Sequence, residues 1–173
     1  RDRFKGKPEH IYNYKKADDA IKKLGDYIHD LYQQRDHMFK SPHSVIQVRR
    51  VSGEAVGMSV PGSAEALIEA LLGDGDSETD LMERLRSIGN VDIQLAKRKT
   101  PYLDPYLFKT FPHQSILEHI IKDNFNHEME LVYRSSVADE NVIATLGIPV
   151  ITWGPKGGNE HIANEYINLS LIH

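Results

Sequence analysis

The residues best suited to chemistry lie in a glycine-rich stretch from Gly154 to His161. It follows an apolar segment, Pro149 to Trp153, that is typical of a strand buried on both faces of an α/β sheet. In open α/β sheets ligands bind at the carboxyl ends of the strands, which is where this loop is expected. Because a neutral imidazole is a good zinc ligand, His161 is a candidate metal ligand.

Glu165 stands four residues after His161, and on the last helix expected here the two side chains would share a face. Taken alone the pattern is weak, since His-x-x-x-Glu on a helix is more often a surface pair. The loop also lacks the Gly-Lys-Ser/Thr ending of a phosphate-binding loop. The residues by themselves therefore leave a metal site and a solvated pair both open.

A second candidate is His10, at the end of the stretch FKGKPEH from Phe4 to His10. The plain alternative is an ordinary loop histidine before a helix. That helix is predicted from about Asn13 to Arg35, because apolar residues recur at steps of four and three, namely Ala17, Ile21, Leu24, Ile28 and Leu31.

The elements around these candidates divide the chain near residue 104. In the first part we predict strands at Arg3 to Gly6, Ser44 to Val51, Glu54 to Val60 and Asn90 to Lys97, with a short helix after Asp76 to Thr79. Ala64 to Leu72 is ambiguous: its composition favours a helix, whereas its position between turns permits a strand. If it is a strand, the order is that of a ferredoxin-like fold, an antiparallel sheet with helices on one face.

The second part begins after the proline-containing linker Thr100 to Pro105. Helices are predicted at Gln114 to Phe125 and Asp139 to Leu146. Strands are predicted at Met129 to Tyr133 and Pro149 to Trp153. This alternation indicates a parallel α/β sheet. The predicted domains are thus residues 1–104 and 105–173.

The composition narrows the functional classes. The 173 residues are 40% hydrophobic and 27% charged, as in a globular protein. The net charge of −4 gives no electrostatic reason to expect nucleic acid or an anionic membrane as a partner. Cysteine is absent, which excludes disulfides and cysteine metal sites and fits an expected cytoplasmic location. Both chain ends resemble cuts through structured elements, so we expect a fragment.

The second half resembles a known enzyme family. It resembles the closing region of the zinc-dependent amide hydrolases in five successive features. They are an Asp-containing turn before a helix, a Gly-Ile-Pro-Val segment (Gly147 to Val150), a Gly-Pro pair, His161 and an Asn-Glu-Tyr stretch (Asn164 to Tyr166). That family includes acetylornithine deacetylase, succinyl-diaminopimelate desuccinylase and carboxypeptidase. The Gly-Lys-x-x-His around His10 resembles the start of the family's lid domain.

The resemblance implies a role for each candidate. His161 would bind one of two zinc ions (or cobalt), and Gly157 and Gly158 would line the substrate pocket. Asp139 and Asn141 would lie at a turn near that pocket. The implied architecture is a ferredoxin-like lid and dimerisation domain, followed by the C-terminal portion of an α/β zinc-exopeptidase catalytic domain.

His10 would reach across a homodimer into the partner's active site and stabilise the oxyanion formed on the scissile carbonyl. The implied substrate is a small N-acyl amino acid or peptide. The implied class is a deacylase, carboxypeptidase or dipeptidase.

The sequence also departs from the family. Met58 to Pro61 stands in place of Asn-x-x-Pro, Glu69 to Leu71 in place of Asp-x-Arg, and Ser135 to Val137 in place of Gly-Gly-Thr. The family's other metal ligands and its general base would precede residue 1. Since one histidine cannot hold a catalytic zinc, we predict that this chain alone is inert. A non-catalytic dimerisation or small-molecule-binding module and a degenerate relative are the alternatives.

Overall fold

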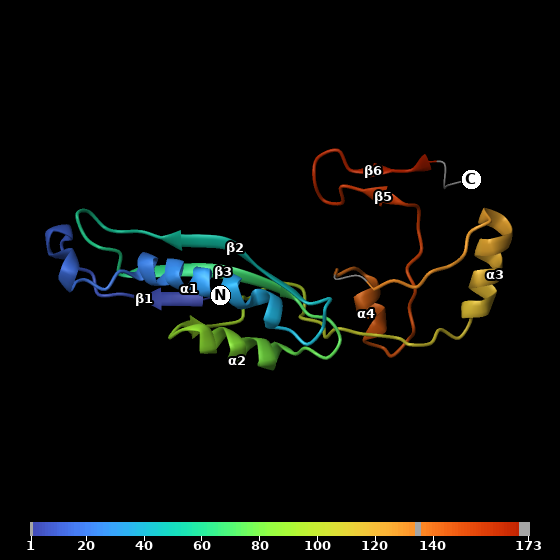
Figure 1. Cartoon of the computed structure of the whole chain (residues 1–173), viewed down its shortest axis with the longest axis horizontal. Coiled ribbons are helices and arrows are strands. Elements are labelled where there is room, and N and C mark those ends of the chain that lie inside the picture. Colours follow the sequence, from blue (N-terminus) through green and yellow to red (C-terminus); the bar gives the residue numbers. More distant parts are fainter. Residues whose placement is uncertain (1, 134–135, 170–173) are drawn as a thin grey trace. The chain divides into compact units, whose positions relative to one another are not determined.

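The computed structural model describes residues 2–133 and 136–169 (Figure 1). The described chain forms two compact units, one up to Pro105 and one from Tyr106 onward, with residues 136–137 grouped with the first. No helix among the described residues is long and apolar enough to cross a membrane.

The first unit is a four-stranded antiparallel sheet with helices on one face (Figure 1). Its strands lie in the order β2-β3-β1-β4. This arrangement confirms the predicted mixed α/β, ferredoxin-like fold. Its elements are β1 (Asp2–Lys5), the 3-10 helix η1 (Ile11–Lys16), α1 (Ala20–Gln34), the 3-10 helix η2 (Arg35–His37), β2 (Val45–Gly53), β3 (Ser63–Leu71), α2 (Glu78–Ile88) and β4 (Asp92–Ile93).

The ambiguous segment is the strand β3, paired with β2 on one side and β1 on the other. Its Ala64 and Ala66 are buried beneath the helices. The burial of this alternate face outweighs the helix propensity of its Ala, Glu and Leu residues.

The first helix begins later than predicted. α1 starts at Ala20, because the Asp19 carboxylate accepts hydrogen bonds from the N–H groups of Ile21 (2.8 Å) and Lys22 (3.0 Å). Ala17 is extended and lies outside α1. A two-bond bridge between Lys7 and Asp18 holds this part of the chain away from helical geometry.

Two strand predictions need correction. β2 continues through Gly53, so Ser52 and Gly53 are not a turn, and Glu54 to Val60 is not a strand. The predicted strand from Asn90 shortens to β4, which pairs with Asp2 and Arg3 within the described part of the chain. A strand can be only as long as the partner that completes its hydrogen bonds.

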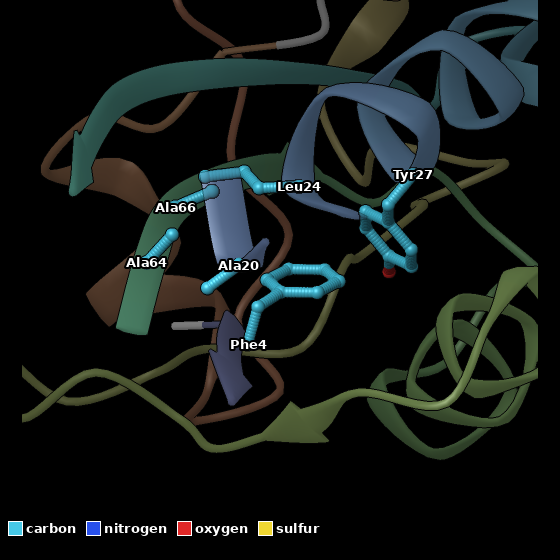
Figure 2. Close-up of a cluster of buried hydrophobic side chains, with 6 residues drawn as sticks. All are labelled: Phe4, Ala20, Leu24, Tyr27, Ala64 and Ala66. Atoms are coloured by element: carbon cyan, nitrogen blue, oxygen red, sulfur yellow. The ribbon is translucent and has the colours of Figure 1, made fainter. Parts of the chain in front are cut away.

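The core of the first unit lies between the sheet and the helices. Figure 2 shows the cluster of Phe4, Ala20, Leu24, Tyr27, Ala64 and Ala66. The rings of Phe4 and Tyr27 meet edge to face at 5.1 Å between centroids. A second cluster around Leu31, Ile46 and Leu85 extends the core beneath α2.

Asp2 is an ionisable residue within this core, only 1% exposed. Burial raises its pKa from 3.8 to about 6, because a carboxylate loses its hydration there. At a pH between these two pKa values, the Asp2 carboxyl keeps its proton in the folded state and loses it in the unfolded state. The free energy of unfolding must therefore fall as the pH rises from about 4 to about 6.

We expect Asp2→Asn to remove that pH dependence. The variant should match the wild type near pH 4 and exceed its free energy of unfolding by up to about 3 kcal/mol near pH 8. Urea denaturation followed by circular dichroism at both pH values measures this. The control is Asp92→Asn on the exposed side of β4. A wild type whose unfolding free energy stays constant over this range would contradict the expectation.

The second unit is less regular than predicted. Its elements are α3 (Gln114–Phe125), α4 (Glu140–Ala144), β5 (Gly157–Gly158) and β6 (Tyr166–Ile167). α3 has the predicted bounds. Among residues 106–133 and 136–169, the strands expected at Met129 to Tyr133 and Pro149 to Trp153 do not form, nor does the parallel sheet, and a turn follows His161 where a helix was expected. The expectation that the chain ends within a structured element concerns positions 170–173, which lie outside the described part.

The missing sheet has a physical reason. A strand of a parallel sheet is stable only between neighbours that bury both its faces. Here Leu131, Val132 and Trp153 are at least half exposed. Among the described residues of this unit, Ile121 and Ala144 are the only buried hydrophobic side chains. We therefore expect the second unit to be the less stable part of the chain.

Candidate functional site

His10 is the N-cap residue of η1, with an exposed side chain. Its Nδ1 accepts a hydrogen bond from the N–H of Tyr12 at 3.2 Å. On either side the main chain is bonded to the segment before β3: Ile11 N–H donates to the Met58 carbonyl, and Val60 N–H donates to the Glu9 carbonyl, both at 2.8 Å. The histidine is thus presented on a fixed backbone.

Met58 is bonded to Ile11, the residue after His10, through this pairing, although sequence alone gives it only as a departure from the Asn-x-x-Pro pattern. Its side chain is 68% exposed. Ser59 forms the bridge partner of His10, and its hydroxyl donates to the Val56 carbonyl at 2.6 Å. The Gly-Lys-x-x-His segment and the segment that replaces Asn-x-x-Pro therefore meet in space.

Asp139 and Asn141 lie at the start of α4. Asp139 is the N-cap residue but makes no side-chain cap bond. The Asn141 side-chain oxygen accepts the N–H of Ala138 at 2.9 Å, which closes the turn before the helix. The structure thus gives Asn141 a local structural role. Ser135, part of the neighbouring departure from the family pattern, lies outside the described residues.

Gly157 and Gly158 form β5, which pairs with β6 in a small hairpin. A Cβ on Gly157 would lie 2.5 Å from the carbonyl oxygen of Tyr166. Only glycine permits that approach of the two backbones. The pairing of the two hairpin strands by itself explains why residue 157 is glycine, without a ligand.

His161 lies in the turn of this hairpin, with φ of 64°. Asn159 and Asn164 also have positive φ, and the Asn159 amide donates to the Asn164 carbonyl at 3.1 Å. This turn replaces the expected helix. The prediction that His161 and Glu165 share a helical face is therefore wrong.

The metal prediction can be tested against the ligands present. Catalytic zinc needs three protein ligands. Residues 2–133 and 136–169 contain no group of three or more His, Cys, Asp or Glu side chains placed to hold a metal ion. The described residues alone do not fit a catalytic zinc site, and the exposed imidazole of His161 can supply one ligand at most.

Sequence reasoning missed two polar features. One is the N–H of Tyr12, which holds the His10 ring; a main-chain group leaves no signal in the sequence. The other is Asp76, whose buried carboxylate joins two loops of the first unit. The sequence around Asp76 indicates only a helix start.

Comparison with known proteins identifies the first unit. The family model described as "Peptidase dimerisation domain" matches residues 3–91, from within β1 to just past α2. The chain therefore belongs to this family of peptidase dimerisation domains.

Among solved structures, the chain resembles the aminopeptidase PepT from Bacillus cereus ATCC 10987. The two share 16% sequence identity with a TM-score of 0.67. The match covers 99% of this chain and 46% of PepT, so the chain spans less than half the length of that relative. At this identity the likeness shows the fold. No curated protein matches the chain.

Proposed function

We propose that the parent protein is a metal-dependent amide hydrolase whose dimerisation domain is the first unit of this chain. The second unit would be the closing part of its catalytic domain. The main support is the peptidase dimerisation-domain match over residues 3–91, followed by a second unit that carries the family-like His161 turn. The similarity to PepT runs through both units.

The chain's own residues would then have these roles. His161 would supply one metal ligand, with zinc as the proposed ion. Gly157 and Gly158 would line the substrate pocket, and Asp139 and Asn141 would lie near it. His10 would donate a hydrogen bond to the oxyanion in the partner subunit's active site. An N-acyl amino acid or a short peptide is the proposed substrate.

Hydrolysis by the full-length parent tests this function. We expect turnover of N-acyl amino acids or dipeptides that a chelator abolishes and added zinc restores. His161→Ala should lower both the bound metal and kcat, the latter by at least about 100-fold, because the variant would lack one of the residues that would hold the ion.

The matched control is His113→Ala, since His113 is exposed and its side chain makes no cap bond. That variant should keep the metal and the rate. Turnover that survives the chelator, or an unchanged metal content in His161→Ala, would contradict the proposal.

We further propose that a homodimer forms through the β2 edge. β2 is the terminal strand of the sheet, and such an edge offers unpaired backbone groups to a second strand. Val51 on this strand is 51% exposed. On α1, the side chains of Ile21, Ile28 and Tyr32 recur at steps of seven and four residues, which places them on one face of the helix. Tyr32 contacts the strand, since Val48 N–H donates to its hydroxyl at 3.3 Å.

Replacing Val51 by lysine should therefore weaken the dimer by at least tenfold, roughly 1.4 kcal/mol. Light scattering after size-exclusion chromatography at several concentrations would measure the dissociation constant. Leu95→Lys is the control, because Leu95 is 47% exposed and follows β4 at the opposite edge. If only the control variant becomes monomeric, the interface lies at the β4 edge instead.

A non-catalytic dimerisation module is the second candidate. The observation that favours it is that the family model covers the dimerisation domain and not the second unit. The parent would then dimerise, bind no stoichiometric metal and hydrolyse none of these substrates. Metal bound without turnover would instead favour a degenerate relative.

A further inference from the structure

The imidazole of His10 is held at one nitrogen by the main chain. Tyr12 donates its N–H to Nδ1 at 3.2 Å, and the His10 carbonyl accepts the N–H of Asn13 at 2.7 Å. With the flanking bonds to the segment before β3, these contacts determine both the backbone and the ring orientation of His10. They are all internal to the first unit.

This contact has a chemical consequence. An N–H can donate only to a ring nitrogen that has a free lone pair, and a neutral imidazole carries one proton on its two nitrogens. If Nδ1 accepts from Tyr12, the proton must lie on Nε2. A histidine in this form can donate a hydrogen bond from Nε2 but cannot accept a proton there. The contact therefore favours a role of His10 as a hydrogen-bond donor to an oxyanion and excludes a role of Nε2 as a general base.

We propose that the main-chain N–H of Tyr12 is a positioning group that locks neutral His10 in the Nε2–H tautomer, so that its Nε2 acts only as a hydrogen-bond donor. The donor role rests on the proposed hydrolase function. The tautomer is a property of this chain and can be measured without any substrate. A purely structural cap would not need an imidazole, since Asn, Asp, Ser and Thr are the usual residues at this position.

Nitrogen NMR of the 15N-labelled 173-residue chain tests the lock directly. We expect a scalar coupling across the hydrogen bond between the Tyr12 amide nitrogen and His10 Nδ1, together with nitrogen shifts of a single Nε2–H form. His113 is a matched control, because it precedes α3 as an N-cap residue without a side-chain cap bond. It should show shifts averaged between the two tautomers. A His10 averaged in the same way as His113, or protonated on Nδ1, overturns the proposal.

Variants separate the N–H from the tyrosine side chain. Tyr12→Pro removes the N–H and should release His10 to the averaged shifts, whereas Tyr12→Ala should keep both the coupling and the single tautomer. Proline also restricts the preceding Ile11, so the amide spectrum of the first unit serves as the check on folding. If that variant does not fold, the wild-type spectrum and Tyr12→Ala still decide the matter.

Kinetics of the parent test the donor role. His10→Asn keeps an acceptor for the Tyr12 N–H but loses the imidazole donor, and should lower kcat by about 100-fold with little change in KM. An unchanged kcat in this variant, with the lock seen by NMR, would overturn the donor role while leaving the chelator-sensitive hydrolase intact. A parent that hydrolyses nothing would instead refute the proposed function, and the NMR result would still decide the tautomer.

Discussion

Replacing Gly6 by alanine should lower the free energy of unfolding of the first unit by roughly 4 kcal/mol or more. A Cβ at this position would lie 2.1 Å from the carbonyl oxygen of Asp18, 3.0 Å from the nitrogen of Ala20 and 3.1 Å from the carbonyl oxygen of Pro61. All three are main-chain atoms, so no side chain can rotate away. The clash must move the backbone itself.

The backbone at Gly6 has little freedom to move. Gly6 N–H donates to the Gly62 carbonyl at 2.8 Å, and Ala20 N–H donates to the Pro61 carbonyl at 3.1 Å. The end of β1, the start of α1 and the start of β3 therefore meet at one point. Relieving the clash would break bonds that connect three elements, which is why the expected cost exceeds that of an ordinary surface substitution.

Gly25→Ala is the matched control. Gly25 lies within α1, and a Cβ there would meet nothing within 4 Å. Alanine should stabilise the helix by about 0.5–1 kcal/mol, because glycine loses more backbone entropy on folding. Urea denaturation of both variants measures the difference. Equal unfolding midpoints for Gly6→Ala and the wild type would show that the three elements do not meet as described.

Asp76→Ala should lower the free energy of unfolding by about 3–4 kcal/mol. The Asp76 side chain is buried, and its carboxylate accepts the N–H groups of Lys40 and Ser41, both at 2.9 Å, and the hydroxyl of Ser44 at 2.8 Å. Hydrogen bonds to a charged group contribute roughly 1.5–3 kcal/mol each, and the loss of several is not additive. Removal would also leave these donors unpaired.

The network joins two loops. Residues 38–44 precede β2, and residues 72–77 precede α2. Ser44 extends the link, because its hydroxyl oxygen accepts the N–H of Gly73 at 2.8 Å. Loss of the carboxylate should therefore loosen the ends of both β2 and β3. Hydrogen exchange of the amides of Lys40, Ser41 and Gly73 would show this loosening locally.

The pH dependence has a definite sign. Burial acts to raise the pKa of Asp76, but the hydrogen bonds from Lys40, Ser41 and Ser44 outweigh it and lower the pKa below 3.8. The stabilisation is therefore complete above about pH 4 and lost as the pH falls further. Asp74→Ala, an exposed neighbour, is the control and should change stability by no more than about 0.5 kcal/mol. If both variants unfold at the same urea concentration, Asp76 does not hold the loops.

Local sequence determined the elements whose signals are local. The bounds of α3 are as predicted. The polar run from Asp76 marks the start of α2, where the Ser77 hydroxyl accepts the Asp80 N–H at 3.1 Å. The order of strands and helices predicted the antiparallel, ferredoxin-like fold on the condition that Ala64 to Leu72 is a strand, and the structure and the family match support that fold.

His161 was first singled out by its place after a glycine-rich loop, the roles of all candidate site residues came from the resemblance, and those roles stay predictions. The structure adds the local reasons for several of them: His10 is held by Tyr12, Asn141 closes a turn, and Gly157 lies against the Tyr166 backbone. Gly6, part of the same Gly-Lys-x-x-His pattern as His10, is required by the meeting of three segments. None of these reasons can be derived from residue spacing.

Tertiary contacts decided what local signals leave open. Ala64 to Leu72 became a strand because β1 and β2 supply hydrogen-bond partners on both sides. Pro149 to Trp153, with a strong strand pattern, did not become one, because among the described residues it has no pairing partner. A strand exchanges its backbone hydrogen bonds with neighbours that lie far away in sequence, whereas a helix satisfies them within itself. The sequence alone therefore predicted the helices more reliably than the strands.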